Sequence, residues 1–177
     1  MNLEQKKLFG IALEGEAKML LEIGEAYRKL EETEYRVDRV IERLQKDIEE
    51  LYEEPIRLAE LDRQAHIARA EREGIKITSI FEFDRPLFLY MEPWRWMEIT
   101  RRFKSLDELG KYKKEIKRLK EEYPLLRERI RSNWRDSEVR EALSKYLERV
   151  KEIAEKCESI IGEYPYLILE EILGSEG

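Results

Sequence analysis

The stretch VREALSKYLERVKEIAEKCESI, residues 139–160, carries the most regular pattern in the chain. Apolar side chains recur there at alternating steps of four and three residues, the spacing of a helix that buries one stripe in a coiled-coil-like seam. Asp136 or Ser137 can cap its start, and Gly162 can end it in the left-handed conformation. The positions of the stripe are Val139, Leu143, Tyr146, Val150, Ile153, Cys157 and Ile160. The stretch therefore predicts a long helix with one buried face.

A second and longer seam precedes it, in residues 9–51. It alternates in the same way but contains two acids, Glu16 and Glu34, which we expect near solvent at a helix edge because an unpaired carboxylate in an apolar seam is costly. Paired in the seam, they would instead fix register. Near the middle of the two seams, Ile41 and Val150 are expected to be buried. The series is Phe9, Leu13, Glu16, Leu20, Ile23, Tyr27, Leu30, Glu34, Val37, Ile41, Leu44, Ile48 and Leu51.

Prolines mark the predicted limits of the helices. Pro55 predicts a kink or break in the first helix, with a further helical segment over 56–73. A third helix is expected over 105–123, because Ser-Leu-Asp-Glu at its start forms a capping box, and Pro124 should stop or bend it. Pro165 precedes a short terminal helix.

Residues 75–92 read differently from the rest. In IKITSIFEF, residues 75–83, apolar and polar side chains alternate with the period of two that is typical of a strand. Asp84-Arg85-Pro86 has turn chemistry, and 87–91 can return as a second strand. Pro93 suits the first turn of another helix. The segment therefore predicts a small β-hairpin that needs the helices or another chain to cover it.

These patterns predict a mainly α fold. Charged residues make up 42% of the chain, well above the average of about 25% and typical of long solvated helices. We expect an antiparallel, coiled-coil-like bundle of long helices, with 3–54 pairing with 137–161. The whole chain, 1–177, is expected to form one helical domain with the hairpin as an insertion. The scarcity of Asn and Gln beside so many charges is typical of hyperthermophile proteins.

A single cysteine, Cys157, and a single histidine, His66, limit the chemistry of the chain. They exclude an internal disulfide and a structural zinc site, so we expect neither metal nor cofactor. No stretch has the character of a signal peptide or a membrane span, so a cytoplasmic protein without a membrane partner is expected. Asp62 can orient the His66 imidazole, but no second catalytic group is identifiable. An enzyme is therefore the least favoured class.

Glycines in the N-terminal helix have a possible phosphate-binding spacing. Gly10 and Gly15 are five residues apart, but Glu16 and Ala17 stand where a phosphate loop requires Lys and Ser or Thr. An acid at that position would repel phosphate. We expect these glycines, with Gly24, to permit the close approach of another helix instead.

Aromatic side chains gather between residues 81 and 103. So many large apolar groups are too many for a short ribbon and a helix start to leave in water, which predicts a partner surface. On a helix, Trp94 and Trp96 point about 200° apart, so we expect one to face its own bundle and the other a partner. Self-association as a homodimer is the favoured partnership, with another protein as the alternative. The predicted partner-binding residues are Phe81, Phe83, Phe88, Trp94, Arg95 and Trp96.

Basic side chains concentrate in residues 94–135, which carry 14 basic and 7 acidic groups. Two interpretations stay open. The block is neutralised by the acidic helices of the same molecule, or it binds nucleic acid through phosphate contacts and aromatic stacking. A structural or protein-interaction function is the first choice and nucleic-acid binding the second. The candidate nucleic-acid contacts are Arg101, Arg102, Lys104, Lys111, Lys113, Lys114, Lys117 and Arg118.

Overall fold

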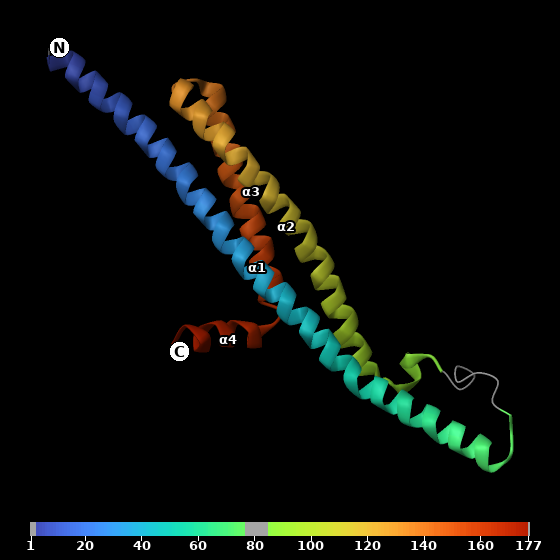
Figure 1. Ribbon diagram of the computed structural model, residues 1–177. Helices are drawn as coiled ribbons and strands as arrows, with labels where there is room; N and C mark the ends of the chain where they lie inside the picture. The colour runs from blue at the N-terminus through green and yellow to red at the C-terminus, as the bar shows by residue number, and fades with distance from the viewer. Residues whose placement is uncertain (1–2, 77–84, 177) are drawn as a thin grey trace. The chain divides into compact units, whose positions relative to one another are not determined.

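The computed structural model describes the backbone of residues 3–76 and 85–176 and the side chains of 15–76, 85–170 and 173. Every regular element among these residues is helical, which confirms the mainly α prediction (Figure 1). The elements are α1 (Leu3–Arg72), the short 3-10 helix η2 (Leu87–Tyr90), α2 (Pro93–Asn133), α3 (Ser137–Ile161) and α4 (Pro165–Glu176). The chain divides into unit 1, Met1–Val40 with Glu108–Gly177, and unit 2, Ile41–Asp107.

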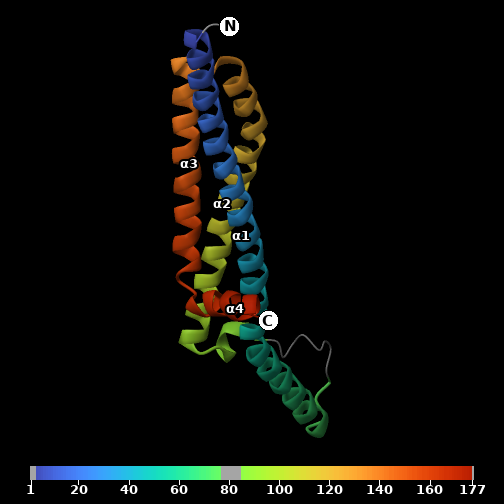
Figure 2. The same ribbon diagram turned by 90° about the vertical axis from the view of Figure 1, so that its left-hand side faces the viewer.

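Unit 1 is a bundle of three long helical segments. The first part of α1 and α3 run in the same direction, and the second part of α2 runs antiparallel to both (Figures 1 and 2). The three-residue connection between α2 and α3 forces this reversal. The short predicted terminal helix is present as α4, which lies across the C-terminal end of α3 (Figure 2). The predicted neighbours α1 and α3 are thus confirmed as adjacent, but they are parallel to each other.

The predicted pattern of α3 is confirmed, because all seven stripe positions, Val139 to Ile160, are buried. Asp136 caps the helix by accepting a hydrogen bond from the Glu138 amide at 2.9 Å. The expectation for Gly162 is wrong: its φ of −63° is right-handed. The left-handed glycine is Gly74, with a φ of +70°, just beyond the end of α1.

Cys157 lies in this buried stripe and is completely inaccessible to solvent. Burial raises the pKa of its thiol to about 11, and the nearby charge of Glu115 contributes to the rise. At neutral pH the side chain is therefore a protonated, apolar-like group of the core.

The register of α1 differs from the predicted seam at alternate positions. The common positions, such as Leu30 and Val37, are buried, but Ile41 is half-buried and its neighbour Val40 is buried instead. Glu34 is half-buried and pairs with Lys120 at 3.4 Å. The buried polar side chains of α1 are those of Thr33 and Asp47. The buried positions are Met19, Ile23, Ala26, Leu30, Thr33, Val37, Val40, Leu44, Asp47, Ile48, Pro55 and Ala70.

Two predicted helix breaks are absent. α1 continues through Pro55 to Arg72, and α2 continues through Pro124 to Asn133. The predicted helix start at Ser105 is wrong as well, because Ser105 is a buried residue inside α2. Pro124 is exposed, so water can solvate the carbonyl group that a proline deprives of its helical donor.

The predicted β-hairpin is contradicted. Leu87–Tyr90, the expected second strand, is a 3-10 helix, closed by hydrogen bonds from the Leu89 amide to the Pro86 carbonyl at 3.1 Å and from the Met91 amide to the Phe88 carbonyl at 3.2 Å. No strand occurs in residues 3–76 or 85–176. Most of the expected first strand, 77–83, lies outside the described residues. The segment between Pro86 and Pro93 lacks the apolar–polar alternation of a strand, and a tight local turn satisfies its amides instead.

The glycine expectation holds at one position in a different form, because a ring from a turn and not another helix makes the close approach. A Cβ atom at Gly15 would lie 2.5 Å from the Trp134 ring, which no side chain tolerates without movement. Gly15 therefore lets the ring of the α2–α3 connection pack directly on the α1 backbone. A Cβ atom at Gly24 would meet nothing within 4 Å, so close approach does not explain that glycine.

Candidate interaction surface

The start of α2 is attached to α1 beside Pro55, the residue that was expected to break α1. Pro55 has no amide hydrogen, so the Leu51 carbonyl loses its normal helical donor. Arg95 supplies a donor: its Nη1 bonds that carbonyl oxygen at 3.0 Å. The Arg95 guanidinium also lies over the Trp94 ring, 4.8 Å from its centroid. This predicted partner-binding arginine is thus engaged inside unit 2, where it compensates for the proline.

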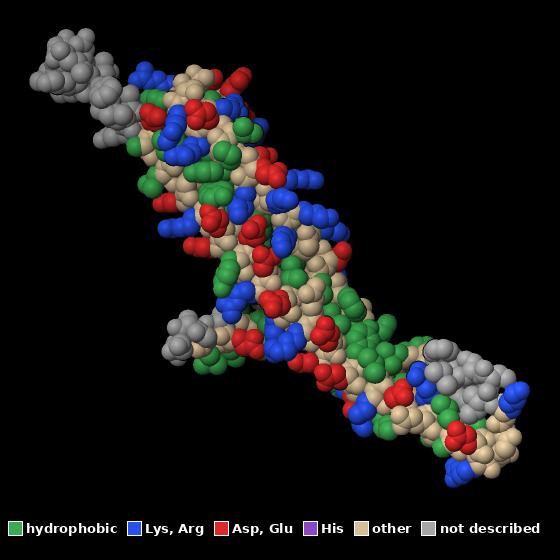
Figure 3. Space-filling model, viewed as in Figure 1, with side chains coloured by type: hydrophobic (Ala, Val, Ile, Leu, Met, Phe, Trp, Pro, Cys, Tyr) green, Lys and Arg blue, Asp and Glu red, His purple; other side chains and the backbone are tan. Residues whose placement is uncertain are grey.

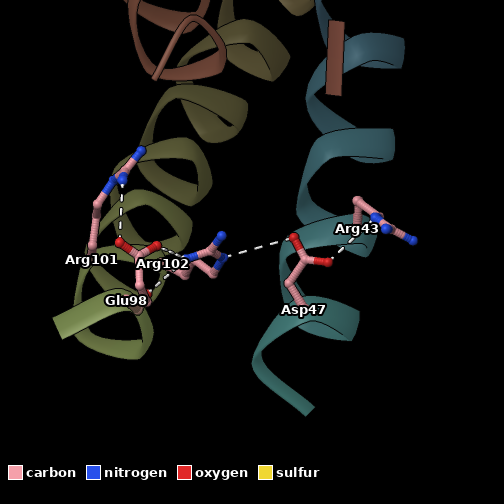
Figure 4. Close-up of polar contacts among 5 residues, drawn as sticks. All are labelled: Arg43, Asp47, Glu98, Arg101 and Arg102. Carbon is pink, nitrogen blue, oxygen red and sulfur yellow. Dashed lines mark hydrogen bonds and ion pairs between the residues drawn. The ribbon is translucent and has the colours of Figure 1, made fainter. Parts of the chain in front are cut away.

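A cluster of buried charges forms a second attachment in unit 2 (Figure 4). The Asp47 carboxylate of α1 forms ion pairs with Arg43, whose Nε lies 3.3 Å away, and with Arg102 of α2, whose Nε lies 3.7 Å away. Arg102 Nη1 also bonds the Glu98 carboxylate, whose other oxygen lies 3.6 Å from Arg101. The side chains of Asp47 and Arg102 are only 10% and 12% exposed to solvent. In so dry a setting, charges this close interact more strongly than exposed pairs.

A third attachment links the 3-10 helix to α1. The Tyr90 hydroxyl donates a hydrogen bond to Asp62, whose other oxygen lies 3.2 Å from His66 Nε2. This hydrogen bond is the main reason the pKa of Asp62 is lowered; burial opposes the shift, and the charges of His66 and Arg85 assist it. The predicted Asp62–His66 pair is present, and its third partner is a tyrosine that anchors η2.

The three attachments hold a set of large apolar side chains that the chain leaves in solvent. We call this set the aromatic surface. Each member is between 51% and 68% exposed, and Figure 3 shows hydrophobic side chains gathered over the start of α2. Several large apolar side chains exposed within one short segment mark an interaction site in many proteins. The members are Phe88, Leu89, Trp94, Trp96, Met97 and Phe103.

The two tryptophans lie on opposite flanks of the exposed face of α2. Trp94, Met97, Arg101 and Lys104 follow the spacing of one helical face, and Trp96 is about 200° from Trp94. Both rings are nevertheless half-exposed, at 52% and 51%. The expectation that one of them packs on its own bundle is therefore wrong. Trp94 also donates a hydrogen bond from Nε1 to Glu92.

The other predicted partner residues divide into two groups. Phe88 belongs to the aromatic surface, whereas Phe81 and Phe83 lie outside the described residues. The predicted partner-binding residues did not include three of the members, Leu89, Met97 and Phe103. Met97 follows Trp94 by three residues on one helical face, and this spacing is the signal that identifies it.

The basic stretch is partly neutralised by α1. Lys113 pairs with Asp38 at 2.6 Å, and this contact raises the pKa of Lys113. Lys120 pairs with Glu34, and Arg102 is held in the buried cluster, so it is not presented to solvent. The remaining candidates are exposed: Arg101, Lys104, Lys111, Lys114, Lys117 and Arg118.

Within the described residues, no three histidine, cysteine or acidic side chains are grouped so as to hold a metal ion. In the same part of the chain, no helix has the length and apolar character needed to cross a membrane. Comparison with known proteins finds no matching family model, curated protein or solved structure.

Proposed function

We propose that this chain is a helical protein-interaction module that self-associates through the aromatic surface of unit 2. The observation that carries the proposal is the exposure of all six members of that surface within residues 88–103. Tryptophan and arginine are the residues that most often concentrate binding energy in interfaces, and both are present here.

The support beneath the aromatic surface favours the same function. Arg95, the Asp47–Arg102 pair and the Tyr90–Asp62 hydrogen bond fix the start of α2 and η2 against α1 before any partner arrives. A preorganised surface loses little conformational freedom on binding, which leaves more of the interaction energy for affinity. An exposed apolar surface on such a support has the properties of a docking site.

Replacing Trp96 with alanine is expected to weaken self-association by at least about thirtyfold, which corresponds to the roughly 2 kcal/mol of a hot-spot residue. Because the ring is half-exposed, the melting temperature should change little. Sedimentation velocity over a range of protein concentrations measures the first quantity, and thermal unfolding measures the second.

The matched control for this experiment is Leu125→Ala, which removes an apolar side chain of α2 that is 71% exposed and lies outside the aromatic surface. It should leave the mass distribution unchanged. A wild-type chain that stays monomeric at every accessible concentration would refute self-association. Equal effects of Trp96→Ala and Leu125→Ala would remove the aromatic surface from the proposal.

Nucleic-acid binding by the basic stretch is the second candidate, carried by the exposed Lys114, Lys117 and Arg118 of α2. If it occurs, reversing these three charges should lower affinity for duplex DNA and reduce the salt dependence by a slope of about 0.9 for each phosphate that is no longer neutralised. Gel-shift titrations at two salt concentrations measure both effects. Absence of binding by the wild type at low salt would exclude this function.

A further inference from the structure

Unit 1 has an uncovered groove between α1 and α3. Its volume is about 650 Å³, within the roughly 300–1,000 Å³ range of protein ligand sites. The floor is apolar and includes two small alanines, which keep it open. The floor residues are Ala26, Leu147, Val150 and Ala154.

The rim of this groove is predominantly acidic. It carries the carboxylates of Glu22, Glu25, Glu155 and Glu158, against the ammonium groups of Lys29 and Lys151. Glu158 is engaged with Arg36. An apolar floor with an acidic rim fits an apolar helical face that is flanked by cations, the geometry of helix-in-groove recognition.

The start of α2 has the complementary character. Trp94 and Met97 are exposed on one helical face, and Arg101 and Lys104 continue that face over the next two turns. Apolar side chains thus meet an apolar floor, and two cations meet an acidic rim. Both complementary surfaces belong to the same chain, so a second copy of the chain is the partner that supplies either one.

We infer that the Trp94–Met97 face of the aromatic surface of one copy docks in the α1–α3 groove of a second copy. This inference rests on the proposed function and adds the surface on the partner that receives Trp94 and Met97. Because each copy carries both surfaces, two copies that make the contact reciprocally form a two-fold dimer.

Charge reversal on the two sides tests the pairing. The patch variant is Arg101→Glu with Lys104→Glu, and the groove variant is Glu22→Lys with Glu155→Lys. Each variant alone places like charges against each other, so its self-association should weaken by about tenfold or more. In an equimolar mixture every contact joins opposite charges again, so the mixture should form heterodimers with an affinity near that of the wild type. Sedimentation velocity on each sample measures these masses.

The control exchanges the exposed α3 pair Glu141 and Lys145, as Glu141→Lys with Lys145→Glu, and should associate like the wild type. If the patch variant unfolds, Lys104→Glu alone replaces it. A groove variant that dimerises like the wild type, while Trp96→Ala is monomeric, overturns the inference but leaves the proposed function intact. A mixture that stays as weak as its components also overturns the inference. Rescue in the mixture alone supports it.

Discussion

Replacing Arg102 with methionine is expected to lower the free energy of unfolding by about 3 kcal/mol, the lower end of the range for breaking a buried ion pair. The substitution leaves the Asp47 carboxylate buried with Arg43 as its remaining partner in the cluster, and it removes the bond to Glu98. Retention of Arg43 is the reason to expect the lower end. Chemical denaturation monitored by circular dichroism measures the loss.

The neighbouring arginine provides the matched control. Arg101→Met removes a guanidinium that is 43% exposed, so its cost should stay within about 1 kcal/mol. Combining Asp47→Leu with Arg102→Met removes both charges of the pair and should recover part of the lost stability. Equal costs for the two arginine substitutions would show that the cluster of Figure 4 contributes no more than surface pairs.

Leu30→Ala is expected to cost about 3–4 kcal/mol, because Leu30 is fully buried in unit 1 and its removal leaves a cavity as well as lost burial. Leu21→Ala makes the same chemical change on the same helix at a position that is 63% exposed. Its cost should stay below about 1 kcal/mol. Denaturant titration of the two variants compares them directly, and similar midpoints would contradict the buried register of α1.

That register shows where sequence patterns reach their limit. All seven predicted stripe positions of α3 are buried, because most of its apolar residues stand at isolated positions; the two buried residues that were missed, Ala154 and Ile161, directly follow Ile153 and Ile160. In α1 the positions beside the seam are also apolar, as at Val40 and Ile41, so two registers fit equally well. In unit 1, α1 contacts both α2, through the Tyr27–Tyr123 stack, and α3, through Arg36 and Glu158. A helix with two neighbours buries a broader stripe than one seam defines.

Long-range contacts explain the wrong predictions about helix breaks and strands. From its sequence neighbours alone, Pro55 indicates a break in the helix. The cost of continuing α1 through Pro55 is reduced by the hydrogen bond from Arg95, which lies far along the chain, to the Leu51 carbonyl. Apolar and polar side chains alternate poorly in Leu87–Tyr90, and prolines enclose the segment. A partner strand was therefore required to make it extended. Adjacent residues in the sequence reveal neither the Arg95 donor nor the absence of such a strand among the described residues.

The candidate surface was partly predictable. Clustering of aromatics located its place in the chain, and Phe88, Trp94 and Trp96 are among its exposed members. Asp47 was not identified, because the predicted seam contains its apolar neighbour Ile48 and leaves Asp47 out. The burial of Asp47 depends on its ion pair with Arg102. From the sequence, Arg102 was grouped with the other cations of the basic stretch.

The burial of Cys157 gives the molecule a built-in chemical reporter. It is the one thiol of the chain, it lies in unit 1, and its protonated, enclosed sulfur cannot react with an alkylating reagent until that unit opens. The rate of alkylation under native conditions therefore reports on the opening of the three-helix bundle of unit 1. It does not report on the opening of unit 2. Because this thiol is enclosed in the native chain, the self-association that we propose would need no disulfide between chains and would respond to concentration and not to oxidants.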